Sequence, residues 1–254
     1  MLGARRAAIA LTVLLASCLS WVIYLLLARA KLGSPTECFA LAQVCVVLLA
    51  APYLAAYTSR TEGDSVLLTL SRISTRRRLL MQLATSQMPL LCWAFLSTGF
   101  LFFSMELPFV KALQILAVLG IYSFSAGAVG MWGAKVFRDV LFSTEFAYLL
   151  WCATIGGMFL LAPLERYIDS VQPIIPLVLH ANPLIAVCAI LGETDIFRTP
   201  LLYELTPIPS YLFAYPPWYL VCFWQVFIGG ICLLSLNKFA AAKPLKGTTK
   251  TWLT

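Results

Sequence analysis

The sequence predicts an all-α integral membrane protein whose single transmembrane domain, residues 1–254, crosses the bilayer with six helices. Three observations predict this class. Hydrophobic residues make up 61% of the chain and charged residues only 11%, against about 25% charged residues in soluble domains. Six apolar stretches each have about the 20 residues that a helix needs to cross the hydrocarbon core. The joints between them alternate in their content of Lys and Arg.

The six predicted spans are residues 7–27, 39–57, 79–105, 109–132, 146–161 and 218–236. Sorting the 18 Lys and Arg residues by joint puts 13 on one side of the membrane and 5 on the other. Cytoplasmic loops carry the excess of Lys and Arg, so the side with 13 is predicted to be cytoplasmic. Both termini, including the tail of residues 237–254, then lie inside, as an even number of spans requires.

The first span follows Arg5 and Arg6, as the apolar part of a signal peptide would. Because it is long enough to cross the membrane, we expect an uncleaved signal anchor. The net charge of +7 comes from basic residues beside the membrane exits, without an interleaved aromatic surface. Anionic headgroups of membrane lipids therefore explain this charge better than a nucleic-acid partner does.

The cytoplasmic joint between the second and third spans, residues 59–78, combines an apolar face with basic charge. Val66, Leu67 and Leu70 recur at helical spacing, and Arg72 and residues 76–78 supply the cations. This pattern favours a short amphipathic helix that lies flat beneath the membrane. Two roles are open: a solvated segment whose arginines fix the topology, or a docking element for a cytoplasmic partner.

The fourth span repeats small residues at helical spacing. They form two faces of the helix: Ser123 with Gly127, and Ala126 with Gly130 and Ala134. Such faces let membrane helices approach closely, and packing within the bundle is favoured over a substrate path. The fifth span repeats the device with Ala153 and Gly157, which predicts a close contact between the fourth and fifth helices.

Residues 163–217, between the fifth and sixth spans, hold nine of the fourteen prolines and five acids against two arginines. Within them, residues 174–191 are nearly as apolar as a span, but Pro176, His180, Asn182 and Pro183 interrupt the run. We predict a re-entrant or interfacial pair of short helices, the second capped by Asn182 with Pro183 in its first turn. Non-helical backbone at membrane depth survives only where protein buries it or where it lines a wet cavity. His180, Asn182 and Pro183 are therefore the candidate outer gate.

The eight cysteines form no C-x-x-C pair, and six of them fall inside predicted spans, where Cys behaves as a small apolar residue. Only Cys38 and Cys188 could reach an oxidising outer side. The sequence leaves open whether these two form a disulfide.

Residue types that would carry chemistry are missing from the predicted spans. No span has a charged residue or a histidine near its centre, although proton relays, ion-coupled carriers and intramembrane hydrolases depend on such groups. The lone histidine, His180, cannot assemble a catalytic triad or a multi-histidine metal site. The chain also has no G-x-x-x-x-G-K-[ST] phosphate-binding loop. We therefore expect no enzyme activity, catalytic residue, metal or cofactor in this chain.

Several segments together resemble the permease subunits of ABC-2-type transporters. That family commonly reads E-x-G-T-L-x-x-L-L after the second span, followed by a P-[IVL]-S turn and a basic entry to the third span. The corresponding residues here are Glu62, Gly63, Asp64, Ser65, Val66, Leu67, Leu68 and Leu70, then Ile73, Ser74 and Arg76 to Arg78. Residues 125–138, S-A-G-A-V-G-M-W-G-A-K-V-F-R, and residues 182–187, N-P-L-I-A-V, are also similar. The chain departs from the pattern at Asp64, where the glycine is expected, and at Arg72, which replaces the turn proline.

The resemblance covers nearly the whole chain and implies a permease half in a bacterial inner membrane. It implies pairing with a second permease copy or a paralogue, and with cytoplasmic ATP-binding-cassette ATPases that hold ATP and Mg²⁺ and power export. The residues implied in coupling to the ATPase are Glu62, Gly63, Asp64, Leu67, Leu70 and Arg72. A second hypothesis is a membrane anchor or assembly subunit that transports nothing, and a neighbouring ATPase gene would distinguish the two. The sequence leaves the substrate and the direction of transport open.

Overall fold

In the computed structural model, the described residues are 2–61, 75–168, 170–192, 197 and 199–241. Every regular element in these ranges is a helix, and six helices are long and apolar enough to cross a membrane. They are α1 (Leu2–Arg29), α2 (Pro35–Thr61), α4 (Thr75–Ser104), α5 (Phe109–Phe137), the continuous helical stretch Val140–Leu164 that begins with α6 (Val140–Gly156), and α11 (Trp218–Ala241). The predicted all-α fold class with six membrane-spanning helices is confirmed. The predicted coupling segment falls outside the described residues; its members are Glu62, Gly63, Asp64, Leu67, Leu70 and Arg72.

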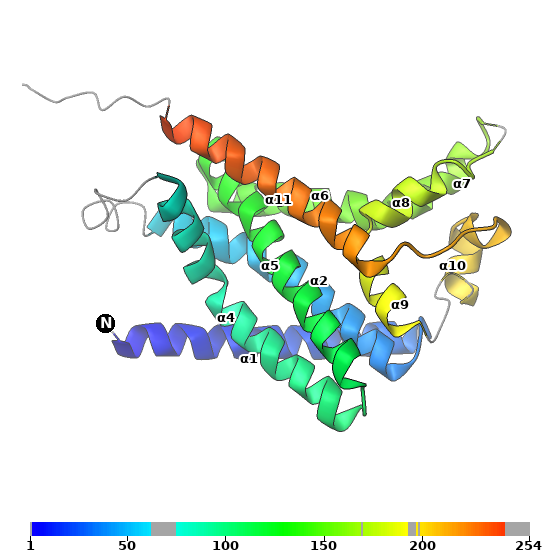
Figure 1. Ribbon diagram of the computed structural model, residues 1–254, viewed down its shortest axis with the longest axis horizontal. Coiled ribbons are helices and arrows are strands. Elements are labelled where there is room, and N and C mark those ends of the chain that lie inside the picture. Colours follow the sequence, from blue (N-terminus) through cyan, green and yellow to red (C-terminus); the bar gives the residue numbers. More distant parts are fainter. Residues whose placement is uncertain (1, 62–74, 169, 193–196, 198, 242–254) are drawn as a thin grey trace, which may run out of the picture.

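Successive long helices run in opposite directions (Figure 1). The start of α1, the end of α2 and start of α4, the joint between α5 and α6, and the end of α11 therefore lie at the same end of the bundle. This end holds nine of the 13 Lys and Arg residues in the described ranges, and we name it the basic end. The joint between α1 and α2 and the joint between α4 and α5 lie at the opposite end.

The start of α2 is fixed by a capping box. The Ser34 hydroxyl accepts a hydrogen bond from the Glu37 N–H at 3.3 Å, and Glu37 Oε2 accepts one from the Ser34 N–H at 2.8 Å. Pro35 follows at the first helical position, where its missing N–H costs no hydrogen bond. The pair satisfies backbone donors that the first turn of a helix leaves free.

The fifth span begins earlier than predicted, at Val140 rather than at residue 146. Arg138 adopts a left-handed conformation with φ of 57°, and the extended Asp139 follows as the N-cap of α6. Asp139 Oδ1 accepts hydrogen bonds from the N–H groups of Leu141 and Phe142 at 2.6 and 3.2 Å. The helix therefore starts at this cap. The low hydropathy of the polar joint is the reason that the sequence placed the start of the span too late.

Helix α5 lies at the centre of the bundle and packs on α2, α4, α6 and α11. Glycine allows each of these approaches. A Cβ at Gly127 would stand 2.6 Å from Gln87 Nε2 of α4, one at Gly130 would stand 2.5 Å from Pro52 Cα of α2, and one at Gly133 would stand 2.6 Å from Ser143 Oγ of α6. At the fourth contact, a Cβ at Gly229 of α11 would stand 2.9 Å from Ser125 Cα.

The contact between α5 and α6 differs from the one predicted. Ala153 is exposed, and Gly157 begins the short helix η1 (Gly157–Leu160), where a Cβ would meet only Val178 at 3.9 Å. The close approach is made instead near Gly133 and Ser143. There the Ser143 hydroxyl also donates a hydrogen bond to the Gly130 carbonyl at 2.6 Å.

Buried amides join the long helices. Gln87 is fully buried; its Nε2 donates to the Ala51 carbonyl of α2 at 3.2 Å, and its Oε1 accepts from the Ser123 hydroxyl of α5 at 2.9 Å. Gln43 Nε2 of α2 donates to the Ser97 hydroxyl of α4 at 2.7 Å. In the absence of water, such bonds hold helices together with modest strength.

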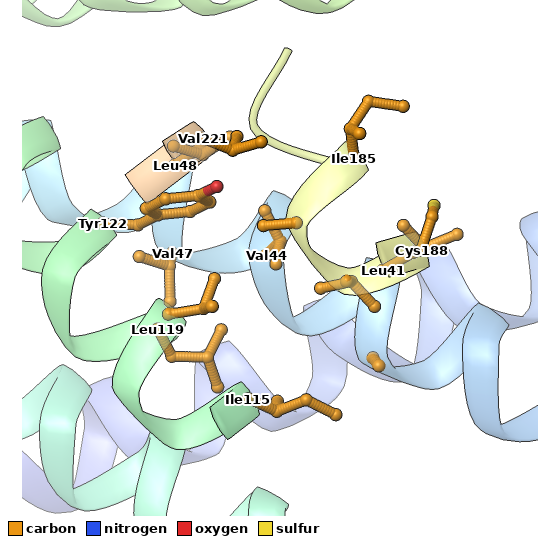
Figure 2. Packing of buried hydrophobic residues seen from close by; sticks show 14 of the residues in the cluster. Leu41, Val44, Val47, Leu48, Ile115, Leu119, Tyr122, Ile185, Cys188 and Val221 are labelled. Atoms are coloured by element: carbon orange, nitrogen blue, oxygen red, sulfur yellow. The ribbon is translucent and has the colours of Figure 1, made fainter. Parts of the chain in front are cut away.

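The segment between α6 and α11 consists of short helices. After η1 come α7 (Leu161–Leu164), α8 (Ile175–Ala181), α9 (Ile185–Leu191), α10 (Pro200–Leu205) and η3 (Ile208–Ser210). The predicted pair of short helices is thus confirmed as α8 and α9. Side chains of α9 and α11 join those of α2 and α5 in the core (Figure 2); the labelled ones are Leu41, Val44, Val47, Leu48, Ile115, Leu119, Tyr122, Ile185, Cys188 and Val221.

All eight cysteines lie in the described part of the chain and are free thiols. The disulfide between Cys38 and Cys188 that the sequence left open is therefore not formed, and both residues are buried.

Candidate functional site

The candidate site is the break between α8 and α9, residues 182–184, together with Ala181 at the end of α8. Ala181, Asn182 and Pro183 each form a hydrogen bond with a different long helix. The Ala181 carbonyl accepts from Gln225 Nε2 of α11 at 3.2 Å. Asn182 Nδ2 donates to a carbonyl of α6 at 3.4 Å. The Pro183 carbonyl accepts from the Tyr122 hydroxyl of α5 at 2.9 Å. These bonds satisfy backbone and side-chain groups that the interruption of the helix leaves free.

Asn182 organises the turn itself. It is 1% exposed, and its backbone is extended, so it ends α8. Its Oδ1 accepts a hydrogen bond from the Leu184 N–H at 3.0 Å, and its carbonyl accepts one from the Ile185 N–H at 3.2 Å. The sequence predicted Asn182 as the cap of the second helix. The side chain does bond the entry to that helix, but α9 begins two residues after Pro183, at Ile185.

The break lies deep in the bundle. Tyr122 is about 20 Å along α5 from its first residue, at 1.5 Å per residue. From that depth, α9 runs back toward the start of α5, because Lys111 Nζ donates to the Leu191 carbonyl at the end of α9 at 2.7 Å. Gly192, with φ of 62°, then ends α9. Helices α8 and α9 therefore enter the bundle and leave it again, which matches the re-entrant one of the two courses, re-entrant or interfacial, that the sequence left open.

Gln225 links the break to the contact between α5 and α11. Besides the bond from its Nε2, its carbonyl accepts a hydrogen bond from the Ser125 hydroxyl of α5. Its Oε1 is buried and has no hydrogen-bond partner among the described residues. One strong acceptor thus remains available beside the break, where it could take a hydrogen bond from water or from a bound molecule.

His180 is not part of these contacts across the break. Its Nδ1 lies 2.6 Å from the Pro176 carbonyl one turn earlier in α8. With Nδ1 protonated, the ring donates this bond to its own helix. The sequence predicted that His180, Asn182 and Pro183 together form an outer gate. In the structure, Asn182 and Pro183 lie in one hydrogen-bonded turn, whereas His180 is a half-buried residue of α8.

Two further hydrogen bonds tie the residues that follow α10 and η3 to η1 and to the residue that follows α7. The Thr206 hydroxyl donates to the Met158 carbonyl at 3.1 Å. The Tyr211 hydroxyl donates to Glu165 Oε1 at 2.6 Å, and this hydrogen bond, followed by burial and the charge of Glu165, raises the pKa of Tyr211 above its usual value of 10.0.

The groups at the break are amides, carbonyls and the phenol of Tyr122, with the thiol of Cys222 also near that phenol. They can donate and accept hydrogen bonds but provide no charge. In the ranges described, no group of three or more His, Cys, Asp or Glu residues is placed to hold a metal ion.

Sequence reasoning did not identify Tyr122, Ser125, Gln225 and Lys111 as site residues. The sequence feature that could have pointed to them is an isolated hydroxyl or amide side chain within an apolar span. No protein-family model, curated protein or solved structure matches this chain.

Proposed function

We propose that this multi-pass membrane protein is the permease subunit of an ABC-2-type exporter. The observation that supports this best is the break at Asn182 and Pro183, a neutral turn deep in the bundle with one hydrogen bond to each of three long helices. Each such bond is worth about 0.6 kcal/mol inside a membrane. A turn held in this way can exchange its partners at small cost, which suits a gate for a polar or amphipathic substrate.

In this proposal, energy enters at the basic end. A cytoplasmic ATP-binding-cassette ATPase holds ATP and Mg²⁺, and this chain contributes no catalytic residue. Closure of the ATPase moves residues 62–74, with Glu62, Asp64 and Arg72 in contact with the partner. The long helices carry that motion to the break, which opens toward the opposite end of the bundle. A second copy of the chain, or a paralogue, completes the path.

The test is an affinity purification of the tagged chain from detergent-solubilised native membranes, with ATPase activity measured on the eluate. We expect an ATPase to co-purify and its activity to be lost or uncoupled in the double variant Glu62→Gln/Arg72→Gln. The matched control is Arg29→Gln/Glu106→Gln, which removes one cation and one acid at the opposite end and should change neither recovery nor activity.

A stable complex that contains no ATPase would overturn the proposal and favour a membrane anchor or assembly subunit instead. Equal effects of the two double variants would overturn the role of residues 62–74 in coupling.

A further inference from the structure

Four arginines gather where α2 ends and α4 begins, at the basic end. Arg76, Arg77 and Arg78 occupy the first turn of α4, and Arg60 lies in the last turn of α2. Arg60, Arg76 and Arg77 are exposed, and Arg78 is partly buried. The first turn of α4 contains no acidic residue that would neutralise them. The result is a concentrated patch of guanidinium groups at the level where the helices leave the apolar bundle.

The bundle holds this patch in place. Gln82 Nε2 donates to the Thr58 carbonyl in the last turns of α2 at 3.3 Å. Arg78 stands one helical turn before Gln82 and therefore on the same face of α4, above the end of α2. Leu79 and Leu83 pack into a second core cluster with side chains of α2, α5 and α11. The arginines thus project from a packed surface, so less conformational freedom is lost when they bind a ligand.

An exposed apolar strip begins directly below the arginines. Leu80 and Met81 follow Arg76 and Arg77 by one helical turn, and Met88 continues the face of Met81 two turns further on. Their exposed fractions are 55%, 50% and 51%. Thr85 lies between Met81 and Met88, is also exposed, and donates its hydroxyl to the Met81 carbonyl at 2.9 Å. Along about 10 Å of α4 at 1.5 Å per residue, the surface is therefore cationic at the headgroup level and mainly apolar beneath it.

We propose that this part of α4, with Arg60, is a binding site for an anionic phospholipid. Guanidinium groups form paired hydrogen bonds with phosphate oxygens, and the strip from Leu80 to Met88 would contact an acyl chain. Zwitterionic lipids bring an ammonium group that opposes the arginines, so charge complementarity favours lipids with a net negative headgroup. This inference does not depend on the proposed function.

The test uses the full chain in a mild detergent, with native mass spectrometry to measure the retention of added lipids. The probes are phosphatidylglycerol, phosphatidylcholine with the same acyl chains, and glycerol phosphate, which has the charge but no chains. The variant Arg76→Gln/Arg77→Gln is compared with Arg29→Gln/Lys31→Gln, which removes two exposed cations at the opposite end. A second variant, Met81→Ser/Met88→Ser, keeps every charge and removes most of the strip.

We expect phosphatidylglycerol to be retained over phosphatidylcholine, and its affinity to fall roughly 30-fold in Arg76→Gln/Arg77→Gln, the factor given by about 1 kcal/mol per cation. The control at Arg29 and Lys31 should retain it fully, and the methionine variant should retain it less well than the wild type. An equal loss of phosphatidylglycerol binding in Arg76→Gln/Arg77→Gln and in Arg29→Gln/Lys31→Gln would overturn the proposal. So would binding of glycerol phosphate as strong as that of the lipid, or full retention by the methionine variant.

Discussion

The substitution Gly130→Ala would test the packing of α5 on α2. The added Cβ would stand 2.5 Å from Pro52 Cα and 2.7 Å from Pro52 C, and each separation must grow to at least 3.4 Å for an ordinary contact. Because both neighbours are backbone atoms, no side chain can rotate away, and the helices themselves must separate. Overpacking of this kind costs about 1–3 kcal/mol, and the better helix propensity of Ala offsets up to about 1 kcal/mol. We expect a net loss of about 1–2 kcal/mol.

The matched control is Gly120→Ala, on the same helix. A Cβ at Gly120 would meet nothing within 4 Å, so the change should be neutral or stabilise the protein by up to about 1 kcal/mol. The free energy of unfolding would be measured for both variants by titrating the purified protein from mild detergent into SDS and following its helical signal. The pair should differ by about 2 kcal/mol, with Gly130→Ala the less stable.

Two results would refute this reasoning. If the two alanine variants unfolded within about 0.5 kcal/mol of each other, the scatter expected of uncoupled surface changes, α5 would not approach α2 at Gly130. If Gly120→Ala were the less stable variant, the face of α5 that packs on α2 would be assigned wrongly.

Three further predictions follow from named hydrogen bonds. Tyr122→Phe removes the bond from α5 to the break, worth about 0.6 and up to about 1.7 kcal/mol, and should raise maleimide labelling of the buried Cys188 on α9 at least about threefold; unchanged labelling would contradict it. Ser34→Ala removes half of the capping box and should cost about 1 kcal/mol, seen as faster hydrogen exchange confined to the first turn of α2. The bond to Glu165 raises the pKa of Tyr211, so its stabilising contribution should be complete below pH 10 and lost as the pH rises through the raised pKa. Subtracting the absorbance titration of Tyr211→Phe from that of the wild type should give a midpoint above 10; a midpoint at or below 10 would refute the contact.

The spans could be predicted because bilayer thickness and hydropathy set them locally. The last predicted span, residues 218–236, coincides with the apolar part of α11. The fifth was misplaced at its start, because Asp139 and Glu145 lower the hydropathy there although Asp139 caps the helix. Capping depends on backbone geometry and can begin a helix inside a polar stretch.

The neighbouring helix that packs on each face of a span could not be predicted in the same way. Small-residue spacing indicates that a helix can be approached closely, but not by which neighbour. In the structure, Gly127 faces α4, whereas Gly130 faces α2. The break at Asn182 and Pro183 could be predicted because proline and asparagine act locally. Its bond with Tyr122 joins residues 61 positions apart, and no local pattern specifies that pairing.

The long helices around α5 are packed differently from the break between α8 and α9. One glycine lies at the contact of α5 with each of α4, α2, α6 and α11, and even a methyl group at any of these positions would collide with the neighbouring helix; they are Gly127, Gly130, Gly133 and Gly229. Small sliding motions between such helices meet repulsion at once, because the interior is close-packed. The break itself meets the same helices through single hydrogen bonds, whereas α9 beside it also packs its side chains into the core. A displacement of α8 and α9 relative to the long helices must therefore release the hydrogen bonds of Tyr122, Gln225 and Lys111, and it must also separate the packed side chains of α9 from the core.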